Sequence, residues 1–139
     1  MASGDYKRAV ASLERSIASQ GTVPDGEWLA YMDQFPRDAS TQAVEFAGLI
    51  LKHYPTSGEA RTRLGARQGV LKKYAEAKLT LEKTIDLGLD DAMTHWRLGE
   101  VFEQTGDTKR AAASYKKSLE LEGDLPEERT AAYGRFMDR

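Results

Sequence analysis

Alanine recurs at one fixed interval along this chain, and that interval restricts the folds that the chain can adopt. The alanines that lie 34 residues apart are Ala9, Ala43, Ala77 and Ala111. Identical residues with the same spacing are Leu64 and Leu98, Gly65 and Gly99, and Leu87 and Leu121. Agreement in several columns at once indicates an internal repeat, in which each unit buries its apolar face against the next.

Within each unit, the apolar residues have the spacing of amphipathic helices. Ala77, Leu81 and Ile85, for example, follow one another at intervals of four residues and therefore share one helix face. The pattern predicts two helices in each unit and eight in the whole chain. The expected helices lie near residues 4–19, 25–35, 40–54, 58–71, 74–88, 92–105, 108–122 and 126–138.

Residues that start and stop helices agree with this period. Gly106 suits the left-handed conformation that ends a helix, and Asp107 can then cap the next helix. Gly4 and Asp5 repeat that pair of residue types, so we expect the same turn there. Thr56 with Glu59 predicts a capping box at the start of a helix.

Two residue types predict local backbone features inside the repeats. A proline cannot continue a helix, so the helix that begins near residue 25 should end just before Pro36. Gly65 and Gly99 lie inside predicted helices, where glycine costs about 1 kcal/mol relative to alanine. We therefore expect a close contact with a neighbouring helix at both glycines.

The segment from Trp96 to Leu121 resembles the tetratricopeptide repeat. That family's pattern has Leu-Gly, an aromatic residue three positions further on, and then alanine with an aromatic residue four positions after it. Here the pattern is filled by Leu98, Gly99, Phe102, Ala111 and Tyr115. The resemblance covers most of the chain and is strongest from Ala60 onward. It implies an all-α fold, a right-handed α-solenoid of about eight helices arranged in helical hairpins.

We expect a single domain over residues 1–139. Its predicted parts are a half repeat at 4–23, full repeats at 24–57, 58–91 and 92–125, and a capping helix at 126–139. The half repeat lacks its first helix, which leaves two alternatives open. Beside a scaffold that binds other proteins, the chain can be an accessory module of a larger multidomain protein, which can be an enzyme, or it can self-associate through an exposed face of Ala9, Val10, Leu13 and Ile17.

The residues that carry catalysis or bind metals are sparse. The chain has no cysteine and two histidines, His53 and His95, on different predicted helices. It contains no nucleophile elbow, phosphate loop or dinucleotide fingerprint. Carboxylate pairs such as Asp90 and Asp91 are interpreted as charges at helix starts. The sequence therefore predicts no enzyme activity, no cofactor and no metal site.

Charge and hydropathy exclude two classes of partner. The formal net charge of −2 gives no general attraction to nucleic acid. No stretch approaches the roughly 20 apolar residues of a membrane span, and the N-terminus has no apolar signal segment. We predict neither nucleic-acid binding nor membrane insertion. The compartment is not determined by the sequence, with the cytoplasm favoured.

The resemblance also implies a function and a surface. In similar proteins, the first helix of each pair lines a concave groove that binds a peptide or protein segment, so we expect a protein–protein interaction scaffold. The residues predicted to line the groove are Trp28, Met32, Thr62, Arg63, Ala66, Met93, Trp96, Arg97 and Glu100.

Alternatives remain open for two residue types in this set. Trp28 and Trp96 share one column of the repeat and can face the groove together, or each can fill a seam between neighbouring helices. Arg63 and Arg97 share another column and can hold an anion, or each can form an ordinary ion pair with a nearby carboxylate. Some relatives bind C-terminal carboxylates with a lysine, asparagine and arginine clamp. This chain has no asparagine, so that clamp is not carried over.

Overall fold

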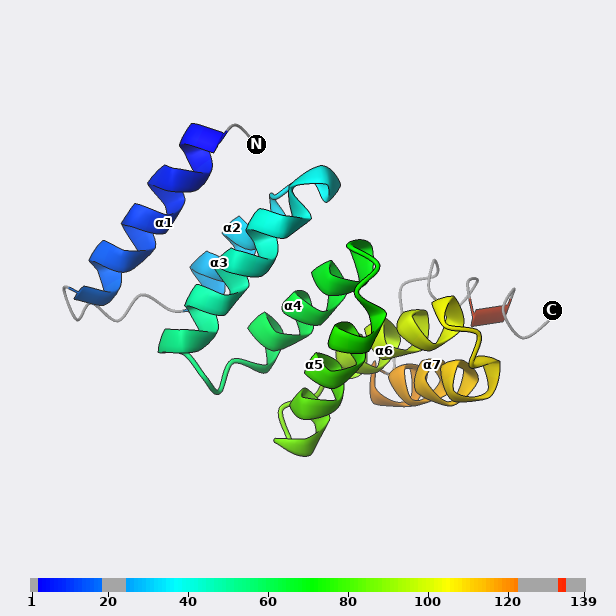
Figure 1. Ribbon diagram of the computed structural model, residues 1–139. Helices are drawn as coiled ribbons and strands as arrows, with labels where there is room; N and C mark the ends of the chain where they lie inside the picture. The colour runs from blue at the N-terminus through cyan, green and yellow to red at the C-terminus, as the bar shows by residue number, and fades with distance from the viewer. Residues whose placement is uncertain (1–2, 19–24, 123–132, 135–139) are drawn as a thin grey trace.

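The computed structural model describes residues 3–18, 25–122 and 133–134, and these residues form helices without any strand. The helices stack side by side along the chain, from α1 at the N-terminal end to α7 (Figure 1). Their bounds are α1 Ser3–Ala18, α2 Asp25–Asp33, η1 Arg37–Ala39, α3 Ser40–His53, α4 Gly58–Val70, α5 Tyr74–Asp86, α6 Ala92–Gln104 and α7 Thr108–Glu122.

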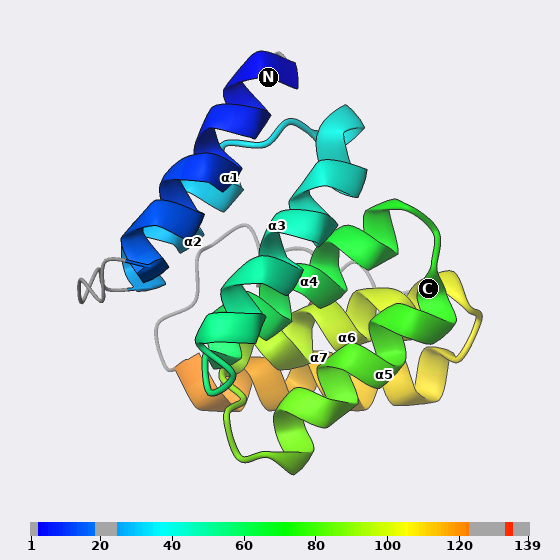
Figure 2. The same cartoon turned by 60° about the vertical axis from the view of Figure 1, so that its left-hand side comes forward.

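The predicted fold class is confirmed as an all-α, right-handed solenoid of helical hairpins. The pairs α2 with α3, α4 with α5, and α6 with α7 each form one hairpin, and each hairpin packs on its neighbour (Figure 2). Seven of the predicted helices are found within a few residues of their expected ends. The predicted capping helix at 126–138 lies outside the described residues except for Tyr133 and Gly134, which are helical.

The α1 helix packs on the first hairpin through a fully buried leucine. Leu13 belongs to the same apolar core as Leu29 of α2 and Phe46 of α3, and Val10 is partly buried beside it. This burial corrects the predicted self-association face, because Leu13 is not available to a second copy of the chain. The side chains of Ala9 and Ile17, which complete that face, lie outside the described residues.

Two apolar cores follow one another along the solenoid. The first lies among α1, α2, α3 and the beginning of α4, and it is rich in aromatic rings. The second lies among α5, α6 and α7, where Leu81, Trp96 and Tyr115 are buried together. Each core joins a hairpin to its neighbour, as expected for a repeat array whose units cannot bury an apolar face alone.

The predicted close contacts at the two helical glycines are confirmed. A Cβ atom built on Gly65 would lie 2.6 Å from Cγ of Leu81. A Cβ atom built on Gly99 would lie 2.6 Å from Cδ1 and Cε1 of Tyr115. Glycine therefore lets the first helix of each of these hairpins approach the second more closely than any other residue allows.

Three helices end in the same type of turn, the Schellman motif. Its left-handed residues, with φ of 62°, 72° and 83°, are Lys72, Gly88 and Gly106. After α6, the N–H of Gly106 bonds to the carbonyl of Glu103 at 3.2 Å, and the N–H of Asp107 bonds to that of Phe102 at 2.9 Å. The prediction of a left-handed Gly106 is confirmed.

Asp107 caps α7 as predicted, because its carboxylate accepts the N–H of Arg110 at 3.1 Å. The matching prediction at the N-terminus is wrong. The helix α1 begins at Ser3, so Gly4 and Asp5 lie inside its first turn instead of forming a turn before it.

The predicted capping box of Thr56 with Glu59 is also wrong. Because α4 begins at Gly58, the capping position falls on Ser57, whose hydroxyl accepts the N–H of Ala60 at 3.2 Å. A capping box does form at the start of α6. There Asp91 and Thr94 each accept the other's backbone N–H, at 3.0 and 3.1 Å.

The first hairpin has an unusual turn. As predicted, α2 ends before Pro36, and its last residue is Asp33. The 3₁₀ helix η1 then begins at Arg37 and leads into α3. The hairpin is therefore joined by a longer turn than the one between α6 and α7.

Candidate functional site

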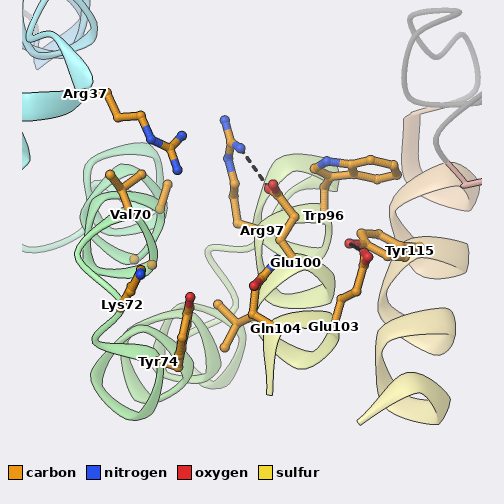
Figure 3. Close-up of a pocket in the computed structure, with 14 residues that line it drawn as sticks. Arg37, Val70, Lys72, Tyr74, Trp96, Arg97, Glu100, Glu103, Gln104 and Tyr115 are labelled. Atoms are coloured by element: carbon orange, nitrogen blue, oxygen red, sulfur yellow. Dashed lines mark hydrogen bonds and ion pairs between the residues drawn. The ribbon is translucent and has the colours of Figure 1, made fainter. Parts of the chain in front are cut away.

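Two adjoining hollows lie along the first helices of the second and third hairpins. The first hollow, of about 450 Å³, is lined by residues of α4, α6 and α7 together with Arg37, Lys72 and Tyr74 (Figure 3). The second hollow, of about 550 Å³, is lined by the beginnings of α4 and α6 and by Asp33 of α2. Ala66 and Arg97 line both, so the two hollows meet at these residues.

Most of the predicted groove residues gather at these hollows. Those that line one or both are Thr62, Arg63, Ala66, Met93, Trp96, Arg97 and Glu100. They come from α4 and α6, as expected if the first helix of each pair provides the inner surface. Contact of these residues with a ligand stays a prediction.

Two predicted groove residues lie elsewhere. Met32 is 1% exposed and belongs to the first core, so its assignment to the groove is wrong. Trp28 is partly buried against the same core, with its ring centroid 6.3 Å from that of Phe46. The helix α2 ends early and is covered by α1 and α3. Its apolar side chains therefore point into the core.

The two tryptophans consequently do not form one row along a groove. Trp28 fills a seam between helices, which was the alternative interpretation of these residues. Trp96 is 9% exposed and packs against Tyr115 in a tilted arrangement with 4.5 Å between the ring centroids, so it is also mainly a core residue. Part of its indole nevertheless lines the first hollow (Figure 3).

Thr62 links two repeats in the floor of the second hollow. Its buried hydroxyl is 2.8 Å from that of Thr94, which also takes part in the capping box of α6. Hydroxyl groups buried in this way are satisfied by each other and need no ligand. Thr62 lies 34 residues after Trp28 and 34 before Trp96, and this hydrogen bond gives a structural reason for a threonine in that column.

The predicted pair of stacked arginines is divided between two ion pairs. Arg63 donates to both carboxylate oxygens of Asp33, at 2.8 and 3.0 Å, and this hydrogen bonding raises the pKa of Arg63 despite partial burial. Arg97 donates to Glu100 at 2.8 Å. The ion-pair interpretation therefore describes both residues.

Arg61, His95 and Arg129 lie 34 residues apart and so form a second column of positive residue types, but Arg61 and His95 do not share a site in the described residues. Arg61 donates to the carbonyl of Pro55 at 3.1 Å. His95 is 2.7 Å from the carboxylate of Asp90, and this hydrogen bond lowers the pKa of Asp90. Arg129 lies outside the described residues. His95 is buried near the start of α6 and has the structural role expected of a histidine paired with a carboxylate.

Sequence reasoning missed Arg67, which fixes the unusual turn of the first hairpin. Its guanidinium donates to the carbonyls of Phe35 and Pro36, at 2.6 and 3.1 Å, and to the hydroxyl of Ser40 at 3.2 Å. Burial lowers the pKa of Arg67 from its ordinary value. The long turn around Pro36 was a signal that backbone carbonyls there would need donors from another repeat.

In residues 3–18, 25–122 and 133–134, histidine and carboxylate side chains form no group of three or more that could hold a metal ion. Among the helices of the same ranges, none has the length and apolar character of a membrane span.

Comparison with known proteins identifies the repeat directly. Residues 94–125 match the tetratricopeptide repeat family model. No curated protein matches the sequence of this chain. The fold resembles that of TTC0263, a thermophilic TPR protein of Thermus thermophilus, with a TM-score of 0.70 and 17% identity over 98% of this chain and 75% of that one.

A second solved structure shares the fold. YrrB, a TPR protein with an unusual peptide-binding site, superimposes with a TM-score of 0.62 and 19% identity. The match covers 80% of this chain and 57% of YrrB. The helical hairpins, the glycine contacts and the match of one repeat to the family pattern agree with one another, and the chain therefore contains a tetratricopeptide repeat at residues 94–125 within a fold that it shares with solved TPR proteins.

Proposed function

We propose that this protein binds a peptide segment of a partner across the two adjoining hollows on α4 and α6. Proteins of this fold generally act as scaffolds for protein–protein interaction and not as enzymes. The observation that carries the proposal is the continuity of the hollows, which meet at Ala66 and Arg97. Together they offer a surface long enough for several residues of an extended chain.

The walls of the hollows are held in place before any ligand binds. Tyr115 packs against Trp96 and donates a hydrogen bond from its hydroxyl to Glu103 at 2.8 Å, while Arg63 is fixed by Asp33 from the neighbouring hairpin. Side chains that are already ordered lose little entropy on binding. This arrangement favours recognition of a peptide by a rigid surface.

The proposal is tested by blocking the junction of the hollows. Ala66 is a partly exposed helical residue, so Ala66→Glu adds a bulky side chain there while keeping a good helix former. A synthetic library of random seven-residue peptides is screened with the wild type, and the affinities of selected peptides are measured by calorimetry. We expect the variant to lower these affinities at least tenfold.

The matched control is Ala113→Glu on α7, which is exposed and lines neither hollow. It should bind the selected peptides as the wild type does, and both variants should keep the helical circular dichroism of the wild type. The proposal is contradicted if the wild type selects no peptide, or if Ala66→Glu binds the selected peptides with unchanged affinity.

A further inference from the structure

In the first hollow, the carboxylates are hydrogen-bonded within the protein, whereas two of the cations have no carboxylate partner among the described residues. Its two carboxylates are both hydrogen-bonded within the protein, Glu100 to Arg97 and Glu103 to the hydroxyl of Tyr115. Two of its cations, Arg37 and Lys72, have no carboxylate partner among the described residues. The unbalanced charge in this hollow is therefore positive.

Arg37 occupies this position because of the unusual turn in the first hairpin. It is the first residue of η1, which follows Pro36, and its side chain is exposed. Figure 3 shows the guanidinium groups of Arg37 and Arg97 on the same side of the hollow. One arginine comes from the first hairpin and the other from the third, so the solenoid brings together residues 60 positions apart.

A third arginine adds to the positive charge at this place. Arg67 uses its donors on backbone carbonyls and on Ser40, so its charge is held in position without an ion pair of its own. Burial is the main cause that lowers the pKa of Arg67, Asp33 opposes this change, and the positive charges of Arg97 and Arg37 lower the pKa further by smaller amounts. The guanidinium group of Arg67 is thus close enough to those of Arg97 and Arg37 to be repelled by both, and an anion near them would relieve that repulsion.

We propose that the first hollow recognises an acidic side chain of the bound peptide, held between Arg37 and Arg97. This inference rests on the proposed peptide binding and names the chemical class of the ligand. A carboxylate suits the position because guanidinium groups donate to it in pairs. A basic side chain would instead meet unpaired cations and carboxylates that already have partners.

Glu100 competes with the peptide for Arg97. Its carboxylate accepts a hydrogen bond from the guanidinium of Arg97 at 2.8 Å on the exposed face of α6, where an ion pair contributes little to stability. A ligand carboxylate must share or replace that contact. Removing the charge of Glu100 should therefore strengthen the binding of acidic peptides, an effect that a structural role of these residues would not produce.

The test uses the same random peptide library with every member acetylated at its N-terminus and amidated at its C-terminus. With both ends neutral, only side chains can supply the anion. We expect peptides bound by the wild type to be enriched in Asp and Glu. A parallel library with free C-termini tests whether the C-terminal carboxylate of the peptide supplies the anion instead. Enrichment there alone, without preference for acidic side chains, would overturn the inference.

Variants then locate the anion. For one selected acidic peptide and its Gln or Asn analogue, Arg37→Gln should lower the affinity for the acidic form about fivefold and leave the neutral form nearly unchanged. Glu100→Gln should raise the affinity for the acidic form about threefold. Both effects should shrink in high salt, because this site is open to solvent. Arg8→Gln, which replaces an exposed arginine of α1, is the matched control and should change neither affinity.

The outcomes separate this inference from the proposed function. If Ala66→Glu abolishes peptide binding but the bound peptides are neutral or basic, the inference fails and the peptide-binding proposal stands. Equal effects of Arg37→Gln on the acidic and neutral peptides, or weaker acidic binding in Glu100→Gln, would also overturn it. If the wild type binds no peptide, the proposed function fails.

Discussion

In the last repeat, α6 and α7 meet at a glycine, whereas in the first repeat α2 and α3 meet at a group of aromatic rings. A Cβ atom on Gly99 would lie 2.6 Å from the ring of Tyr115. In the first repeat, the rings of Trp28, Tyr31 and Phe35 surround Phe46, with centroids 6.3, 5.7 and 5.7 Å from it. The same hairpin is thus built once by close helix approach and once by filling the space between the helices.

This difference between the two hairpins shows that a repeated residue pattern reflects one particular way of packing two helices. Tyr31 occupies the column of Gly65 and Gly99, and a tyrosine there excludes the close contact that the glycines allow. The aromatic packing preserves the hairpin but not the family's residue pattern, and the family match at residues 94–125 falls on the last repeat, which has the glycine contact. The close glycine contact can be predicted from the sequence, whereas the aromatic packing is found only in the structure.

The strongest test of the aromatic packing is Phe46→Ala. Phe46 is fully buried and contacts three rings, so its removal leaves a cavity that rigid neighbours cannot fill. We expect the free energy of unfolding to fall by about 4 kcal/mol, measured by urea denaturation with circular dichroism. The control is Leu79→Ala at a leucine that is 68% exposed, which should change stability by less than about 0.5 kcal/mol. A loss below about 1 kcal/mol for Phe46→Ala would show that the rings do not support the first repeat.

The glycine contact is tested by Gly99→Ala. The added methyl group collides with Tyr115, whose ring cannot move freely because it packs against Trp96 and its hydroxyl is hydrogen-bonded to Glu103. Overpacking should outweigh the better helix propensity of alanine and lower the free energy of unfolding by about 2 kcal/mol. The measurement is thermal and urea denaturation of the purified variant.

The matched substitution is Gly48→Ala in α3 of the first repeat. A Cβ atom at Gly48 meets nothing within 4 Å, so only helix propensity acts there. We expect a stabilisation of about 0.5 to 1 kcal/mol. Opposite signs at the two glycines would support the comparison, and a stabilising Gly99→Ala would refute the close contact at α6 and α7.

The period of the sequence was sufficient to predict the helices and their stacking. Columns such as Leu81 with Tyr115, and Gly65 with Gly99, recur because each repeat buries them in the same way. Residues in such columns contact the neighbouring helix of the same repeat, and the contacting residues are separated by a similar number of positions in each repeat. The fold was therefore predictable in outline, including the helix end before Pro36.

The candidate site was less predictable, because its details depend on contacts between repeats that share no column. Met32 has the register of a groove residue but is buried, since α2 is short and is covered on both sides. Arg37 reaches the first hollow only because η1 lengthens the turn after Pro36. Neither effect leaves a periodic signal, so residue spacing alone assigned Met32 wrongly and omitted Arg37.

The smallest expected effect concerns the turns between paired helices, which differ along the array. One column contains Asp38 in η1 of the first repeat, Lys72 in the second and Gly106 in the last. Lys72 adopts a φ of 62°, the left-handed conformation that Gly106 adopts with 83°. Lysine pays a steric cost of about 1 to 2 kcal/mol there, which glycine avoids.

Lys72→Gly should therefore stabilise the protein by about 0.5 to 1 kcal/mol, because the relief of strain exceeds the greater entropy that glycine has in the unfolded chain. The reciprocal change, Gly106→Lys, should destabilise it by a similar amount in the last repeat. Urea denaturation of both variants measures the two effects. If both substitutions destabilise the protein equally, the side chain of Lys72 stabilises its turn by more than the left-handed backbone costs. The turns of the second and last repeats would then be stabilised in different ways, as the hairpins of the first and last repeats are.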